Sequence, residues 1–218
     1  MNRCSRWLIQ GMASRIRSKK MQGIFIAAWI GVLGWGTRSL MVFDRTPGQS
    51  GPVFTKWPST APLRLGRLIP TLLLFAHAKC TCSGASLDEL AQIMVRSQGR
   101  VEAHVFLYRP VASGWLEGAL WHKAQAIPGV QVSWDEGGIE ARRFSAFTSG
   151  DTLLWSPTGE LWFRGGLTQA RGQAGDNPGR SAILSWLLTG SAPMKQTPVF
   201  GCPVSISGNS ASPGEVLR

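Results

Sequence analysis

The chain has 218 residues and a formal net charge of +11 at pH 7, from 23 basic and 12 acidic residues. The positive charge is concentrated at the N-terminus, because residues 1–20 hold six basic residues and no acidic one. From Gly51 onward there are 15 basic and 11 acidic residues, a net charge of only +4. A nucleic-acid-binding protein carries its positive charge on the folded domain, so this distribution argues against a nucleic-acid partner.

An apolar run follows the basic residues. Residues 21–37 carry no charge, and the stretch "LMVF" at 40–43 extends the run to a length that can cross a bilayer. Two alternatives are a cleaved signal peptide, for which no small-x-small site follows, and a buried helix of a soluble domain, which would show a polar face. The pattern therefore favours a retained transmembrane anchor at 21–43.

Charge around this run predicts the topology. More Lys and Arg residues precede the run than follow it, and the side with more of them stays in the cytoplasm. We therefore expect a basic cytoplasmic tail at 1–20, a single pass through the inner membrane, and residues 44–218 on the periplasmic side. Residues 44–68 are rich in Pro, Gly, Ser and Thr, which predicts a linker that separates the domain from the membrane.

The first half of the predicted domain, residues 69–190, alternates strands and helices. A short apolar run predicts a buried strand at 71–76, and the next helix is expected at 86–99, with Ser86 and Glu89 as a capping box. Its expected buried face is Leu87, Leu90, Ala91 and Met94. A second strand is predicted at 101–108, a helix within 113–129 that buries Leu116, Leu120 and Ala124, a strand at 130–134 and a short helix within 137–147.

In the second half of the domain, the sequence predicts a hairpin and a final helix. Strands at 151–156 and 160–164 flank a turn that contains Gly159. Asn177 is the expected N-cap of the last helix, Pro178 its first residue and Gly190 its end. Its expected buried face is Ile183, Leu184, Leu187 and Leu188. These elements predict an α/β sandwich with a central mixed sheet, followed by a C-terminal tail at 191–218 that carries Cys202.

Several stretches resemble known proteins. "LLLFAHAKC" (72–80) and "LDELA" (87–91) resemble the first strand and active-site helix of thioredoxin-like proteins, and "DTLLWSPTGELWFRGG" (151–166) resembles their closing hairpin. The predicted helix within 113–129 and the strand at 130–134 resemble the insertion found in the membrane-anchored, extracytoplasmic branch of the thioredoxin-like proteins. More narrowly, "WPST", "FAHAKCTCSGASLDEL", "GDNPGR" and "TPVFGCPV" resemble RedB-type thioredoxin-like proteins over about residues 57–204. The resemblance implies a thioredoxin-like three-layer sandwich that exchanges disulfides with protein thiols.

The sequence also departs from the thioredoxin pattern. Thr81 alone separates Cys80 from Cys82, and Ser83 stands where the second cysteine is usual. The stretch "TSGDT" (148–152) replaces the usual cis-proline before the hairpin, and Leu73 replaces the buried acid of the first strand. These departures put the usual substrate docking and the usual proton acceptor in doubt.

The Cys80–Cys82 pair suggests thiol–disulfide exchange without a cofactor. A cysteine at a helix N-terminus has a stabilised thiolate, so Cys80 is the expected attacking group and Cys82 the resolving one. Side chains at i and i+2 diverge on a helix, so the two can bond only if one of them precedes it. Alternatively, Cys80 and Cys82 form a static disulfide or remain two buried thiols. The protein would then be a redox-inert interaction domain.

Copper binding is the other alternative for these residues. Cys80, Cys82 and His77 offer soft sulfur and imidazole ligands for Cu(I), and Cys202 is a further candidate ligand. Cys202 is either an ordinary tail thiol or a third sulfur that returns to Cys80, and the sequence leaves both open. The glycine-rich stretch 172–180 is either an anion site or, as we expect, an ordered loop.

Overall fold

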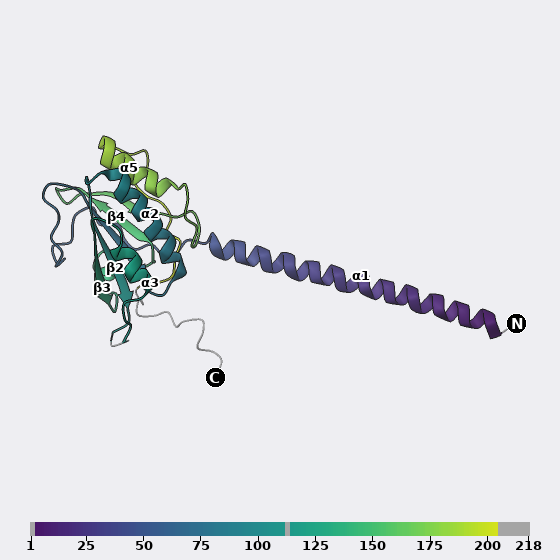
Figure 1. The fold of residues 1–218 in the computed structure, drawn as a ribbon. Coiled ribbons are helices and arrows are strands. Elements are labelled where there is room, and N and C mark those ends of the chain that lie inside the picture. Colours follow the sequence, from purple (N-terminus) through teal and green to yellow (C-terminus); the bar gives the residue numbers. More distant parts are fainter. Residues whose placement is uncertain (1–2, 112–113, 205–218) are drawn as a thin grey trace. The chain divides into compact units, whose positions relative to one another are not determined.

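The computed structural model describes the backbone of residues 3–111 and 114–204, and side chains from residue 21 onward (Figure 1). The chain forms two compact units, which meet between Asp44 and Arg45. The first is the helix α1, Arg3–Asp44. Its part from Met21 to Asp44 is long and apolar enough to cross a membrane, and it coincides with the anchor predicted at 21–43.

The second unit is built on a five-stranded mixed sheet with the order β3-β2-β1-β4-β5. β1, β2 and β3 are parallel, and β4 runs antiparallel to both β1 and β5. The strands are β1 Thr71–His77, β2 Glu102–Arg109, β3 Val130–Glu136, β4 Asp151–Trp155 and β5 Leu161–Gly165. The helices are α2 Thr81–Ser97, α3 Ala119–Gln125, α4 Ile139–Arg143 and α5 Pro178–Thr189.

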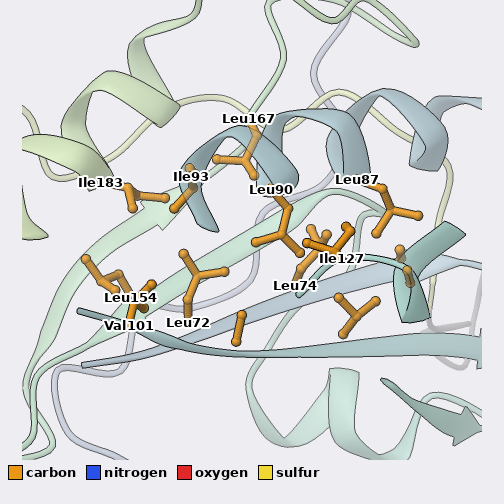
Figure 2. Close-up of a cluster of buried hydrophobic side chains, with 14 of the residues drawn as sticks. Leu72, Leu74, Leu87, Leu90, Ile93, Val101, Ile127, Leu154, Leu167 and Ile183 are labelled. Atoms are coloured by element: carbon orange, nitrogen blue, oxygen red, sulfur yellow. The ribbon is translucent and has the colours of Figure 1, made fainter. Parts of the chain in front are cut away.

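Both faces of the sheet are covered, because alternate residues of β1 enter two separate cores. On one face, Leu72 and Leu74 pack with side chains of α2 and α5, among them Leu87, Leu90, Ile93 and Ile183 (Figure 2). On the other face, Leu73 and Phe75 pack with Phe144, Trp155 and residues around Trp57. The strand order, the helix that follows β1 and the β4–β5 hairpin make this a thioredoxin-like three-layer sandwich, as the resemblance implied.

The stretch 44–68 differs from the expected linker, because its residues from 45 onward belong to the same compact unit as the domain. The amide of Trp57 donates to the Gly159 carbonyl at 2.9 Å, and the Leu161 amide donates to the Thr55 carbonyl at 3.1 Å. The Trp57 ring meets the rings of Phe144 and Trp155 edge-on, with centroids 5.1 and 5.4 Å away. The stretch is irregular, as its composition predicts. It packs on the domain because burial of its apolar side chains is favourable in free energy.

α2 begins earlier than expected. It starts at Thr81 with Cys80 as N-cap, and no side chain caps it, so the predicted capping box of Ser86 and Glu89 is wrong. Both of those residues are buried inside the helix. The expected helix within 113–129 is also shorter, since it begins only at Ala119, after the extended Gly118. Leu116 precedes it and is therefore exposed.

α5 follows the prediction closely. The Asn177 side chain accepts a hydrogen bond from the Arg180 amide at 2.7 Å, and Pro178 is the first helical residue. Gly190 ends the helix with φ at 75°, a left-handed conformation that glycine adopts without a steric penalty. Ile183 and Leu187 are buried as expected, but Leu188 is exposed, so its assignment to the buried face was wrong.

The buried Glu89 carboxylate orders the loop between β5 and α5. It accepts hydrogen bonds from the Gly175 amide at 2.6 Å and the Asn177 side chain at 3.0 Å, and it forms an ion pair with Arg180. Arg180 also pairs with Asp176 at 2.8 Å. This loop is part of the glycine-rich stretch at 172–180. Its Arg180 and Asn177 side chains bond to groups of the domain itself, as expected of an ordered loop.

Removal of this carboxylate tests the network. We expect Glu89→Ala to lower the free energy of unfolding by about 3–5 kcal/mol, because the buried Arg180 charge loses its buried partner and keeps only the exposed Asp176. Chemical denaturation of the full chain in detergent measures the change. Asp88→Ala is the matched control, since its exposed ion pair with Lys123 is worth about 0–1 kcal/mol. Equal losses in the two variants would contradict this account.

Candidate active site

The site lies at the carboxyl end of β1, where the chain turns from the strand into α2. The Cys80 amide donates to the His77 carbonyl at 3.1 Å, and the Cys80 carbonyl accepts from the Ser83 amide at 3.0 Å. Cys80 is extended (φ −99°, ψ 123°), and the helix starts with the next residue. Its thiol therefore stands at the positive end of the helix dipole, which favours a thiolate. The side chain is buried, with 6% of the residue exposed.

Two serines connect this turn to the loop before β4. The Ser83 hydroxyl donates to the His77 carbonyl at 2.9 Å and lies 2.9 Å from the Ser149 hydroxyl. The Ser149 oxygen accepts from the His77 amide at 3.0 Å, and the Gly150 amide donates to the Phe75 carbonyl at 2.7 Å. Ser83, at the usual position of a second cysteine, thus has a structural role. These contacts hold the 148–150 loop against the turn.

The C-terminal segment returns to this loop as an antiparallel partner. The Ser149 amide donates to the Cys202 carbonyl at 2.7 Å, and the Val204 amide donates to the Phe147 carbonyl at 3.0 Å. Gly201 permits this approach, because a Cβ added there would lie 1.9 Å from the Ser149 carbonyl oxygen. The segment therefore holds Cys202 at a defined position beside the loop.

Burial and a cation secure the same segment. Val199, Phe200 and Val204 are buried, and burial of each apolar side chain is worth about 1.5–3 kcal/mol. The Arg171 guanidinium donates to the Gly201 carbonyl. Residues up to 204 of the expected tail thus belong to the domain. The rest, 205–218, lies outside the described residues.

This packing brings two distant sulfurs together. The Sγ atoms of Cys80 and Cys202 are 2.9 Å apart, although 122 positions separate the residues in the chain. All three described cysteines are free thiols, and Cys82, the second residue of α2, is half-buried. The sequence left Cys202 open between a tail thiol and a third sulfur, and the structure places it against Cys80. The apolar residues around it in "TPVFGCPV" were the signal that this segment is buried.

The three thiols differ in their acidity. Burial raises the pKa of Cys80, but hydrogen bonds from the Cys202 thiol, from the amide and thiol of Cys82, and from the Ser83 amide outweigh it and lower the pKa below its ordinary value. Burial and the neighbouring Cys80 raise the pKa of Cys202 to about 12. Burial and the negative charge on Cys80 also raise the pKa of Cys82. Of the three thiols, Cys80 is therefore the one whose surroundings favour the thiolate, whereas the surroundings of Cys82 and Cys202 favour the protonated form.

His77, the candidate nitrogen ligand for copper, is engaged elsewhere. Its Nδ1 accepts a hydrogen bond from the Lys79 amide at 3.2 Å, and its ring packs against Tyr108 and Trp115 with centroids 5.4 and 5.6 Å away. Within residues 3–111 and 114–204, no group of three or more His, Cys, Asp or Glu side chains has a geometry that could hold a metal ion. Copper binding stays a prediction.

Known proteins resemble the chain in fold. No family model matches it, and no curated protein does. An uncharacterized conserved protein from Geobacillus kaustophilus aligns with a TM-score of 0.54 at 19% identity, over 76% of this chain and 95% of that one. A hypothetical protein from Sinorhizobium meliloti 1021 gives a TM-score of 0.54 at 18% identity, over 75% and 96%. An exposed lipoprotein thioredoxin from Streptococcus pneumoniae gives 0.40 at 17% identity, over 56% and 84%.

The acidity of Cys80 depends on its neighbour and can be tested. We expect Cys202→Ala to raise the Cys80 pKa, because it removes a donor that stabilises the thiolate. The rate of alkylation of Cys80 against pH, followed by peptide mass spectrometry, would then have its midpoint at a higher pH than in the reduced wild type. Cys202→Ser is the matched control, since its hydroxyl still donates and should keep most of the shift. An unchanged midpoint in Cys202→Ala would show that Cys202 does not stabilise the thiolate.

Proposed function

We propose that this protein carries out thiol–disulfide exchange, with Cys80 and Cys202 as the redox couple. The observation that carries the proposal is the 2.9 Å contact between their sulfurs at the N-terminus of α2. A disulfide needs a separation of about 2.05 Å, so the bond requires a movement of less than about 1 Å. Protein thiols or disulfides are the proposed partners, and the chemistry needs no cofactor.

This proposal changes the role expected for Cys82. Cys82 lies inside α2, two residues after the N-cap Cys80. Its thiol and amide donate to Cys80 instead, which supports the thiolate without a covalent bond. We therefore assign Cys82 to stabilisation of the thiolate and Cys202 to disulfide formation.

We further propose that the protein is a RedB-type, membrane-anchored member of the thioredoxin-like proteins. The helix from Met21 to Asp44 would be its retained anchor, with the N-terminus in the cytoplasm and the domain in the periplasm. The basic residues before the apolar run support this orientation. A location outside the cytoplasm also suits the chemistry, because disulfides persist in oxidising compartments.

The redox couple predicts which cysteines are needed. We expect oxidation of the full chain in detergent to yield a Cys80–Cys202 disulfide, identified by peptide mass spectrometry. Cys80→Ser and Cys202→Ser should each abolish this bond and turnover with a model disulfide substrate. Cys82→Ser, the matched control, should keep the bond and lose about tenfold or less in rate, since it removes one donor of several. A bond between Cys80 and Cys82 would contradict the couple, and no bond at all would favour the redox-inert alternative.

The topology has its own test. A reporter that is active only in the periplasm, fused after residue 218, should be active, because the basic N-terminal residues keep that end in the cytoplasm. The same fusion with the six basic residues of 1–20 replaced by neutral ones should lose part of this activity. A mature N-terminus near residue 45 would indicate a cleaved signal peptide instead of an anchor.

A further inference from the structure

The two sulfurs of the couple differ in their access to solvent. Cys80 is buried at 6% exposure between the end of β1 and the start of α2. Cys202 is only half-buried, on the segment that lies over this turn. Because a thiolate must reach the sulfur that it attacks, the rate of exchange at each sulfur depends on this access.

We propose that Cys202 is the sulfur that exchanges with partner thiols and that Cys80 is the internal leaving group. This inference rests on the proposed Cys80–Cys202 couple. It differs from the expectation that Cys80 itself carries the bond to the partner.

The surroundings of each sulfur support this division. Attack on Cys202 sends the electron pair to Cys80, where the Ser83 amide and the amide and thiol of Cys82 donate hydrogen bonds. These donors are in place before the reaction, at the positive end of α2. Attack on Cys80 would instead send the electron pair to Cys202, where burial and the neighbouring sulfurs disfavour the charge and Arg171 alone favours it.

The exchange balances as two substitutions at sulfur. A partner thiolate attacks Cys202 Sγ, the Cys80–Cys202 bond breaks, and its electron pair remains on Cys80 as a thiolate. A second partner thiolate then attacks the partner sulfur of the mixed disulfide, and Cys202 leaves and takes up a proton. The partner's two thiols are oxidised to one disulfide, the protein disulfide is reduced, and one of the two partner protons is released to solvent.

The structure also limits how a partner reaches Cys202. The amide of Ser149 and the carbonyl of Phe147 already bond to the chain's own residues 202 and 204. A partner strand cannot pair with these groups unless Val204, which is buried in the core, is displaced. The partner therefore presents its thiol on an exposed, flexible segment that approaches Cys202, without adding a strand to this loop.

The test locates the first mixed disulfide. The full chain with Cys4→Ser and Cys82→Ser, which prevents reshuffling to the other two cysteines, is oxidised and its Cys80–Cys202 bond is verified by mass. It is then mixed with glutathione, quenched with acid and alkylating agent at short times, and digested. We expect glutathione on Cys202 in about tenfold or greater excess over Cys80. Cys202 is the more exposed sulfur, and Cys80 is the better leaving group.

Each result has a distinct meaning. Glutathione mainly on Cys80 would overturn this assignment and leave the redox couple intact. Failure to form the Cys80–Cys202 bond, seen before glutathione is added, would overturn the couple and the assignment with it.

Discussion

The site depends on the pairing of the C-terminal segment with the loop before β4. The Ser149 amide and the Phe147 carbonyl bond to this segment, and Gly201 lets the two backbones approach. Without this pairing Cys80 would stand alone at the start of α2, with only Cys82 as a neighbouring thiol. The antiparallel pairing thus brings a second thiol, that of Cys202, to within 2.9 Å of Cys80 at the first strand–helix turn.

The loop that receives this segment is itself held from several sides. Asp151, the first residue of β4, is buried and pairs with Arg164 of β5 at 2.9 Å. Burial raises the pKa of Asp151, and the Arg164 charge opposes this rise. Arg164 also donates to the Ser145 carbonyl at 2.6 Å and to the Pro52 carbonyl at 2.8 Å. A single guanidinium therefore ties the 145–151 loop to β5 and to the segment expected to be a linker.

This arrangement compensates for the departures from the thioredoxin pattern. The two serines and the Gly150 amide fix the loop without a cis-proline. Leu73 stands where the thioredoxin pattern has a buried acid, and among the described residues the groups that donate to Cys80 are other thiols and amides.

The sequence by itself determined the elements and their class. Short apolar runs, the Asn177 cap and the Gly190 end predicted the strands and α5 correctly, because these signals act between residues close in the chain. The sequence also marked Cys80 as the chemically important position, since it follows the first buried strand. It misplaced the start of α2, because Ser86 and Glu89 match a capping pattern, but Glu89 is buried by contacts with the distant loop at 175–180 and Ser86 lies beside Gly150. Only the tertiary structure decided which cysteine faces Cys80, because the choice depends on backbone pairing between Ser149 and Cys202, which no local pattern records.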